Sequence, residues 1–226
     1  MGTPVPVAAS SVPSASSVSS APSVPSVPSS GALLAGADRD RLLPVDESLA
    51  AVLPEGGLVR GRTVACTGPA APTVALLLAA RATATGSWLA VIGMSWLGVE
   101  AARELGVALE RVVAVDPDRD WAECVAAAVD GFEVVLAVPP RNVPDRLRRQ
   151  VGARLRTRGG VLLALGDRTA ASGADLVLTA ATEAWEGIGR GHGHLAGRRL
   201  RLTVTGRRTP HPRTAILPLG LPVLTG

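Results

Sequence analysis

Residues 62–73 of the chain read RTVACTGPAAPT, and residues 74–82 continue as VALLLAARA. The order is a buried strand, a turn rich in glycine and proline, and an apolar helix. This layout is typical of a phosphate-binding loop, in which backbone N–H groups and a helix N-terminus hold an anion. The stretch therefore indicates a nucleotide-hydrolase core, and its details decide whether a nucleotide can bind.

The turn departs from a working phosphate loop. Such a loop needs glycine for close approach, a lysine for the β- and γ-phosphates, and a Ser or Thr hydroxyl for Mg²⁺. Gly68 and Thr73 are present but two residues too close together, and the chain contains no lysine. Pro69 and Pro72 lie between them, and Pro72 has no N–H where a donor is needed. We interpret these four residues as a degenerate phosphate loop that has lost its nucleotide.

Composition limits the class of protein. Of the 226 residues 47% are hydrophobic, but only 2% are aromatic, so Ala, Val and Leu must build the interior. All 23 basic residues are arginine and the formal net charge is +4, with a pI near 10.7. This balance favours polyanionic partners, although a GC-rich coding bias is an alternative explanation for the arginines.

Other signals point to a cytoplasmic protein. Cys66 and Cys124 lack metal or redox spacing and are expected to be buried thiols in a reducing compartment. Arg81 closes the longest apolar run, which is too short to span a membrane. The N-terminus lacks the basic and apolar regions of a secretory signal.

The chain divides into a tail and one domain. Residues 2–31 are almost entirely Ser, Pro, Val, Ala, Gly and Thr without a charge, and such a segment cannot bury enough surface to fold. We therefore predict a disordered tail at residues 1–35 and an α/β domain at 36–226, with 186–226 as a basic C-terminal extension. The tail is either a tether or partner-binding arm, or a dispensable extension.

Periodicity predicts the elements of the domain. A helical pattern is expected within 33–53, with a helix N-terminus and acidic first turn at 46–49 and a tight turn at 54–57 that ends the helix. Alternating strands and helices follow, which indicates βαβ units and a mostly parallel sheet. The expected strands are 62–67, 87–92, 111–115, 133–138 and 161–165. The expected helices are 73–82, 97–105, 120–129 and 143–156. Residues 175–180, 198–205 and 213–217 read as strands without long helices between them, so we expect an antiparallel extension at one sheet edge.

Several segments resemble a known family. Residues 43–49 (LPVDESL) and 53–61 (LPEGGLVRG), followed by the strand and the Gly68-Pro69 turn, look like the start of a RecA-type core. More specifically, they are similar to the RecA-like ImuA proteins of actinobacteria. Residues 185–195 (WEGIGRGHGHL), followed by Arg198-Arg199, resemble the C-terminal part of that group. The similarity covers residues 38–218.

The resemblance implies a three-layer RecA-like α/β domain with a mostly parallel central sheet and an antiparallel C-terminal extension. It also implies an accessory factor of a damage-induced mutasome. The partners would be a Y-family polymerase homologue and an error-prone replicative-type polymerase.

Three departures argue against ATP hydrolysis. The phosphate loop is short and lysine-free, residues 92–95 (IGMS) lack the catalytic glutamate of such ATPases, and residues 134–138 (VVLAV) lack the aspartate for Mg²⁺. Together these remove the anion cradle, the base that activates water and the metal ligand. We therefore expect no catalytic residues, no cofactor, no metal and no enzymatic activity.

Arginines form the candidate contact surfaces. In the helix at 143–156, Leu147, Val151 and Leu155 recur every four residues and should face the sheet. The outward positions are then Arg146, Arg148, Arg149 and Arg156. A second set follows Glu186, after which no acidic residue occurs, and comprises Arg190, Arg198, Arg199 and Arg201. These arginines are candidates for contact with single-stranded DNA phosphates or an acidic partner, or else form an ordinary solvated surface.

Other motifs are weaker. His192-Gly193-His194 lacks further ligands for a metal and reads as a turn between strands. Trp185 and the glycines after it are better placed to shape a partner or DNA contact. Asp116, Asp118 and Asp120 follow a strand end, where turn and helix-cap roles are favoured over catalysis.

The sequence thus predicts a RecA-like scaffold without chemistry of its own, which docks onto polymerases and, as a further option, onto DNA. One alternative is an ATPase with an unusual loop. The other is a cell-division inhibitor of the SulA type, a related RecA-like family that binds a tubulin-like protein.

Overall fold

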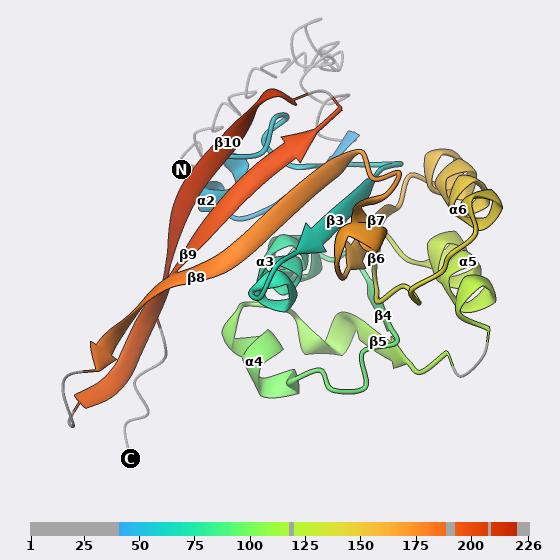
Figure 1. Ribbon diagram of the computed structural model, residues 1–226. Helices are drawn as coiled ribbons and strands as arrows, with labels where there is room; N and C mark the ends of the chain where they lie inside the picture. Colours follow the sequence, from blue (N-terminus) through green and yellow to red (C-terminus); the bar gives the residue numbers. More distant parts are fainter. Residues whose placement is uncertain (1–40, 118–119, 189–192, 208, 221–226) are drawn as a thin grey trace, which may run out of the picture.

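The structure is a computed structural model that describes residues 41–117, 120–188, 193–207 and 209–220 (Figure 1). The predicted tail at 1–35 lies outside these ranges, as do Arg190 and His192. None of the described helices is long and apolar enough to cross a membrane.

The domain is built on an eight-stranded sheet, counted over the described residues, in the order β10-β9-β8-β3-β7-β6-β4-β5. The strands from β8 to β5 in this order are parallel, whereas β9 and β10 are antiparallel additions at one edge. The strand bounds are β3 Thr63–Thr67, β4 Leu89–Ile92, β5 Val112–Val115, β6 Val134–Ala137, β7 Val161–Leu165, β8 Leu176–Ile188, β9 Gly193–Gly206 and β10 Thr209–Gly220. The predicted fold class, with its parallel sheet and antiparallel C-terminal extension, is confirmed.

Helices cover both faces of the sheet, which gives three layers. One face carries α2 (Glu47–Ala50), α3 (Ala71–Ala84) and α4 (Val99–Glu104), and the other carries α5 (Trp121–Gly131) and α6 (Asp145–Arg158). A short 3-10 helix (Leu109–Arg111) precedes β5, and α7 (Arg168–Ala171) links β7 to β8. Two covered faces explain why the central strands read as continuous apolar runs in the sequence.

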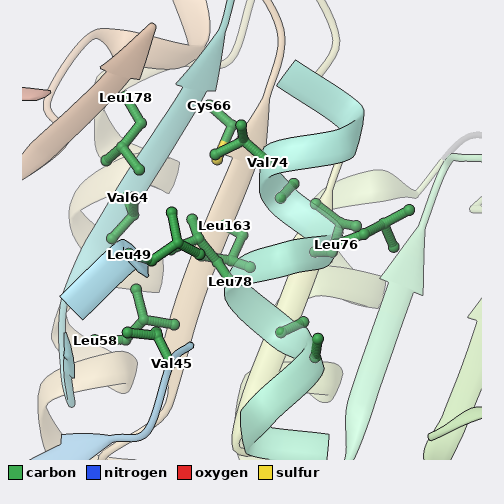
Figure 2. Close-up of a cluster of buried hydrophobic side chains, with 14 of the residues drawn as sticks. Val45, Leu49, Leu58, Val64, Cys66, Val74, Leu76, Leu78, Leu163 and Leu178 are labelled. Atoms are coloured by element: carbon green, nitrogen blue, oxygen red, sulfur yellow. The ribbon is translucent and has the colours of Figure 1, made fainter. Parts of the chain in front are cut away.

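The main core lies between the sheet and α3. Figure 2 shows Val64 and Cys66 of β3 and Leu163 of β7 beside Val74 and Leu78 of α3, and all five are at least 97% buried. Burial raises the pKa of the Cys66 thiol to about 12, so this side chain behaves as a small apolar residue. The aliphatic composition therefore builds the interior, as expected.

The helix expected within residues 33–53 is wrong over most of its described part. Leu42–Leu43 forms β1, which pairs antiparallel with β2 (Leu58–Val59), and the helix α2 that follows is limited to Glu47–Ala50. The turn that leads into β2 needs glycine at position 57, because a Cβ on Gly57 would lie 2.9 Å from the carbonyl oxygen of Leu43. The acidic start of the helix is confirmed, since the Asp46 carboxylate accepts the Ser48 N–H at 3.0 Å.

The C-terminal strands are longer than predicted. Thr179 is the last β8 residue that pairs with β3, so residues 180–188 continue past the carboxyl end of β3 and pair with residues 193–202 of β9. We call these two segments the arm. Figure 1 shows the arm extending well beyond the body of the sheet.

The outer edge of the extension is β10, which contains Pro210, Pro212 and Pro218. Proline cannot donate to a strand ladder and is therefore typical of edge strands. Residues 213–220 of β10 nevertheless pair with β9 in continuous register.

Candidate functional site

The turn between β3 and α3 packs directly on the backbone of β8. Gly68 has a φ of +89°, and a Cβ there would lie 2.4 Å from the carbonyl oxygen of Ala180. Only glycine fits this approach, because its conformation and the space both exclude a side chain. In a phosphate loop, glycine allows the backbone to come close to an anion. In this chain, Gly68 allows the turn to come close to β8 instead.

Two backbone donors of the turn form hydrogen bonds within the protein. The N–H of Ala70 donates to the Ala180 carbonyl at 3.1 Å, and the N–H of Ala71 donates to the Gly68 carbonyl at 3.1 Å. Pro69 and Pro72 have no N–H, and Pro72 lies in the first turn of α3. Two donors of the turn are therefore engaged and two of its positions have none, whereas a phosphate loop holds an anion with converging free N–H groups.

The hydroxyl that would face a metal ion has a different partner. Thr73 accepts a hydrogen bond from the guanidinium of Arg198 on β9. The same guanidinium lies 5.4 Å from the ring centroid of Trp185 on β8, in a cation–π contact. Partial burial lowers the pKa of Arg198, but an arginine stays charged at neutral pH.

A groove of about 390 Å³ opens beside these residues. It lies between the N-terminal part of α3, the segment from Met94 into α4, and the arm. Its walls are mostly apolar, and Trp96 and Trp185 are 59% and 52% exposed. Leu195 of β9 and Leu219 of β10 complete the side formed by the C-terminal strands.

The carboxyl ends of the central strands carry little chemistry. Met94, after β4, is buried, and Val138 and Pro139 follow β6. Asp116 is exposed after β5, and Asp120 occupies the N-cap position of α5 without a side-chain capping bond. Within the described ranges, no group of three or more His, Cys, Asp or Glu side chains is placed to hold a metal ion.

The helix α6 presents a stripe of arginines. Arg146, Arg149 and Arg156 are exposed, and no carboxylate among the described residues pairs with them. The outward orientation predicted for Arg148 is wrong, because its side chain is 24% exposed. Arg148 lines a small cavity under α6 and lies 3.8 Å from the Asp145 carboxylate.

The predicted C-terminal arginines do not act as one patch. Arg199 pairs with Glu186 at 3.4 Å and Arg201 pairs with Glu183, so both are ion pairs across β8 and β9. Arg198 points instead to Thr73 and the groove. Sequence reasoning gave all three one role, whereas the alternation of a strand separates neighbouring residues onto opposite faces.

Sequence reasoning missed Ala180 and most of the groove. The role of Ala180 arises from its backbone carbonyl, so its residue type carried no signal. Trp185 was predicted to shape a contact, but the pairing of β8 with β3 is what places the arm beside α3. The tryptophans themselves, in a chain with 2% aromatic residues, were the available signal for a shared surface.

Comparisons with known proteins give a family and a fold. A family model described as MT3502 N-terminal domain matches residues 51–184, more than half of the chain. The uncharacterized protein Rv3395c of Mycobacterium tuberculosis is 37% identical over 95 residues, which cover 41% of this chain and 47% of that protein. The match therefore spans about half the length of this relative.

Among solved structures, the RadB recombinase has a similar fold. The TM-score is 0.57 at 13% sequence identity, over 75% of this chain and 92% of that chain. Similarity at this level of identity establishes a common RecA-like fold.

We predict that Gly68→Ala destabilises the protein more than Gly86→Ala does. Both glycines have positive φ, which costs an alanine about 1–3 kcal/mol, but nothing lies within 4 Å of a Cβ on Gly86. The contact with Ala180 should add at least about 1 kcal/mol for Gly68→Ala. Urea denaturation of the two variants and the wild type measures the difference. An equal loss in the free energy of unfolding for both variants would mean that β8 shifts to make room for the new methyl group at no energetic cost.

Proposed function

The chain belongs to the MT3502 N-terminal domain family and has a RecA-like fold, and from these premises we propose that it is a non-catalytic scaffold in damage-induced, error-prone DNA synthesis. It would dock onto a Y-family polymerase homologue and an error-prone replicative-type polymerase at damaged templates. The resemblance of residues 38–218 to ImuA-type proteins suggests this setting, and the geometry of the turn supports the absence of nucleotide chemistry.

The observation that carries the proposal is the hydrogen bond from Ala70 to Ala180 together with the contact from Arg198 to Thr73. The first commits a backbone donor of the turn, and the second places a guanidinium on the hydroxyl that would bind Mg²⁺. A nucleotide would have to break both contacts and find its other ligands without a lysine. A scaffold, in contrast, needs only the folded surface.

We predict that Mg²⁺-ATP gives no saturable signal up to millimolar concentration, because the turn offers no cradle for the β- and γ-phosphates. Isothermal titration calorimetry of the full chain measures this. A parallel titration in EDTA controls for loose attraction of ATP to surface arginines, which does not depend on the metal. Stoichiometric binding that requires Mg²⁺ would favour the ATPase alternative.

We predict that the tagged full-length protein retains both polymerases from extracts of damage-treated cells of its own source at about 0.15 M salt. The extract of untreated cells and an unrelated tagged protein are the controls, with detection by mass spectrometry. Retention of a tubulin-like division protein instead would favour the SulA-type alternative. Failure to retain either polymerase would contradict the scaffold role.

A second contact, with single-stranded DNA, is favoured by the unpaired stripe of Arg146, Arg149 and Arg156. Contact through phosphates alone is non-specific and weakens with salt. The stripe lacks interleaved aromatic side chains, so base stacking is not part of this contact.

We predict that changing all three stripe arginines to glutamine weakens binding to a labelled oligo-dT and lowers the slope of log K against log salt by about 2, since each phosphate contact on a single strand contributes about 0.7. Fluorescence anisotropy measures both quantities. The matched control is Arg154→Gln with Arg158→Gln, because both arginines are already paired with Asp130. An unchanged slope in the triple variant would remove DNA from the proposal.

A further inference from the structure

The groove beside α3 combines exposed apolar area with one half-buried cation, counted over the described residues. Two exposed tryptophans line it, Trp96 before α4 and Trp185 on the arm, together with aliphatic side chains. Its volume of about 390 Å³ lies at the low end of the range of roughly 300–1,000 Å³ for ligand sites. The groove is therefore large enough for a few side chains of a bound segment.

Arg198 is the one cationic side chain among the described residues that line the groove. Arg198 is hydrogen-bonded to the neutral Thr73 and stacked on Trp185. Its neighbours on β9 show a contrast, since Arg199 and Arg201 each pair with a glutamate of β8. No carboxylate among the described residues pairs with Arg198. A half-buried guanidinium without a counter-ion gains most from a ligand that supplies a carboxylate.

We propose that this groove is the docking site for a partner peptide that carries large apolar side chains and one acidic residue, the carboxylate pairing with Arg198 and the apolar side chains packing between Trp96 and Trp185. The inference deepens the scaffold function proposed above and rests on it. Aromatic and arginine side chains that meet in a partly enclosed pocket are the usual anchors of protein interfaces.

The lining favours a peptide over a nucleic acid. Among the described residues, its charged members are one arginine and one glutamate, Arg198 and Glu104, so this part of the lining has no excess of positive charge for a phosphate backbone. Proteins that bind single strands line their channels with several cations. The arginine stripe of α6 is a separate surface on the other face of the sheet.

An array of immobilised ten-residue peptides is the probe. Each peptide carries two leucine or phenylalanine residues and one aspartate at varied spacing, and each has a twin with asparagine in place of aspartate. The purified full-length protein should bind a subset of the aspartate peptides at least tenfold more tightly than their twins, as measured by anisotropy of labelled copies.

Two variants test the role of the groove residues. Arg198→Gln should abolish the preference for aspartate, and Trp185→Ala should weaken binding to both twins at least tenfold. The matched controls are Trp88→Ala and Arg111→Gln, because Arg111 lies 5.7 Å from the Trp88 ring in an equivalent pair outside the groove. Trp96→Ala, on a different element, replaces Trp185→Ala if circular dichroism shows that the latter is unfolded.

Several outcomes would overturn the inference. The inference is wrong if both twins bind equally or if no peptide binds. It is also wrong if Trp88→Ala weakens peptide binding as much as Trp185→Ala does, or if oligo-dT displaces the bound peptide. Displacement of the probe by a peptide of residues 221–226, or self-association that Trp185→Ala abolishes, would assign the groove to the chain itself. If the Arg198→Gln and Trp185→Ala variants still retain the polymerases, the groove is not the docking site, and the scaffold function stands. If the wild type prefers aspartate peptides but retains no polymerase, the groove stands, and the polymerase setting is refuted.

Discussion

The carbonyl oxygen of Ala180 accepts the N–H of Ala70 at 3.1 Å, and this contact holds the turn after β3 against β8 at the carboxyl edge of the sheet. It can form only because Gly68 has no side chain. Since β8 is held there against the turn, its continuation extends beyond the edge and brings the arm, with Trp185 and Arg198, beside Thr73 of α3. The same contact therefore engages a donor of the turn and places the arm beside the start of α3.

The local sequence pattern was sufficient to predict those strands and helices whose own residues determine their conformation. The strand at 63–67 and the helix after it follow from an apolar run, a Gly/Pro turn and a second apolar run, and the structure differs from the prediction by a few residues. The end of β8 was not predictable in this way. Residues 181–188 include polar, small and glycine positions without clear alternation, and they become a strand because β9 pairs with them. Pairing between distant segments also explains why Leu42–Leu43 forms a strand where periodicity favoured a helix.

The site shows the same division between local and tertiary information. The degenerate loop was visible from residue types alone, since two prolines and a missing lysine are properties of the sequence. The position of Arg198 was not, because a list of arginines does not say which face of β9 each one occupies. The structural similarity to a recombinase at 13% identity concerns the arrangement of strands and helices. What lies at the carboxyl edge belongs to this chain, and there the buried, apolar Met94 follows β4.

The prolines of β10 have a consequence for how the protein can associate. Pro210, Pro212 and Pro218 remove backbone donors from the outermost strand, so another chain cannot extend the sheet there through a complete ladder of hydrogen bonds. Association at this border must depend on side chains, which distinguish one molecule from another far better than a backbone does. The border thus disfavours the indiscriminate sheet-to-sheet growth that leads to aggregates.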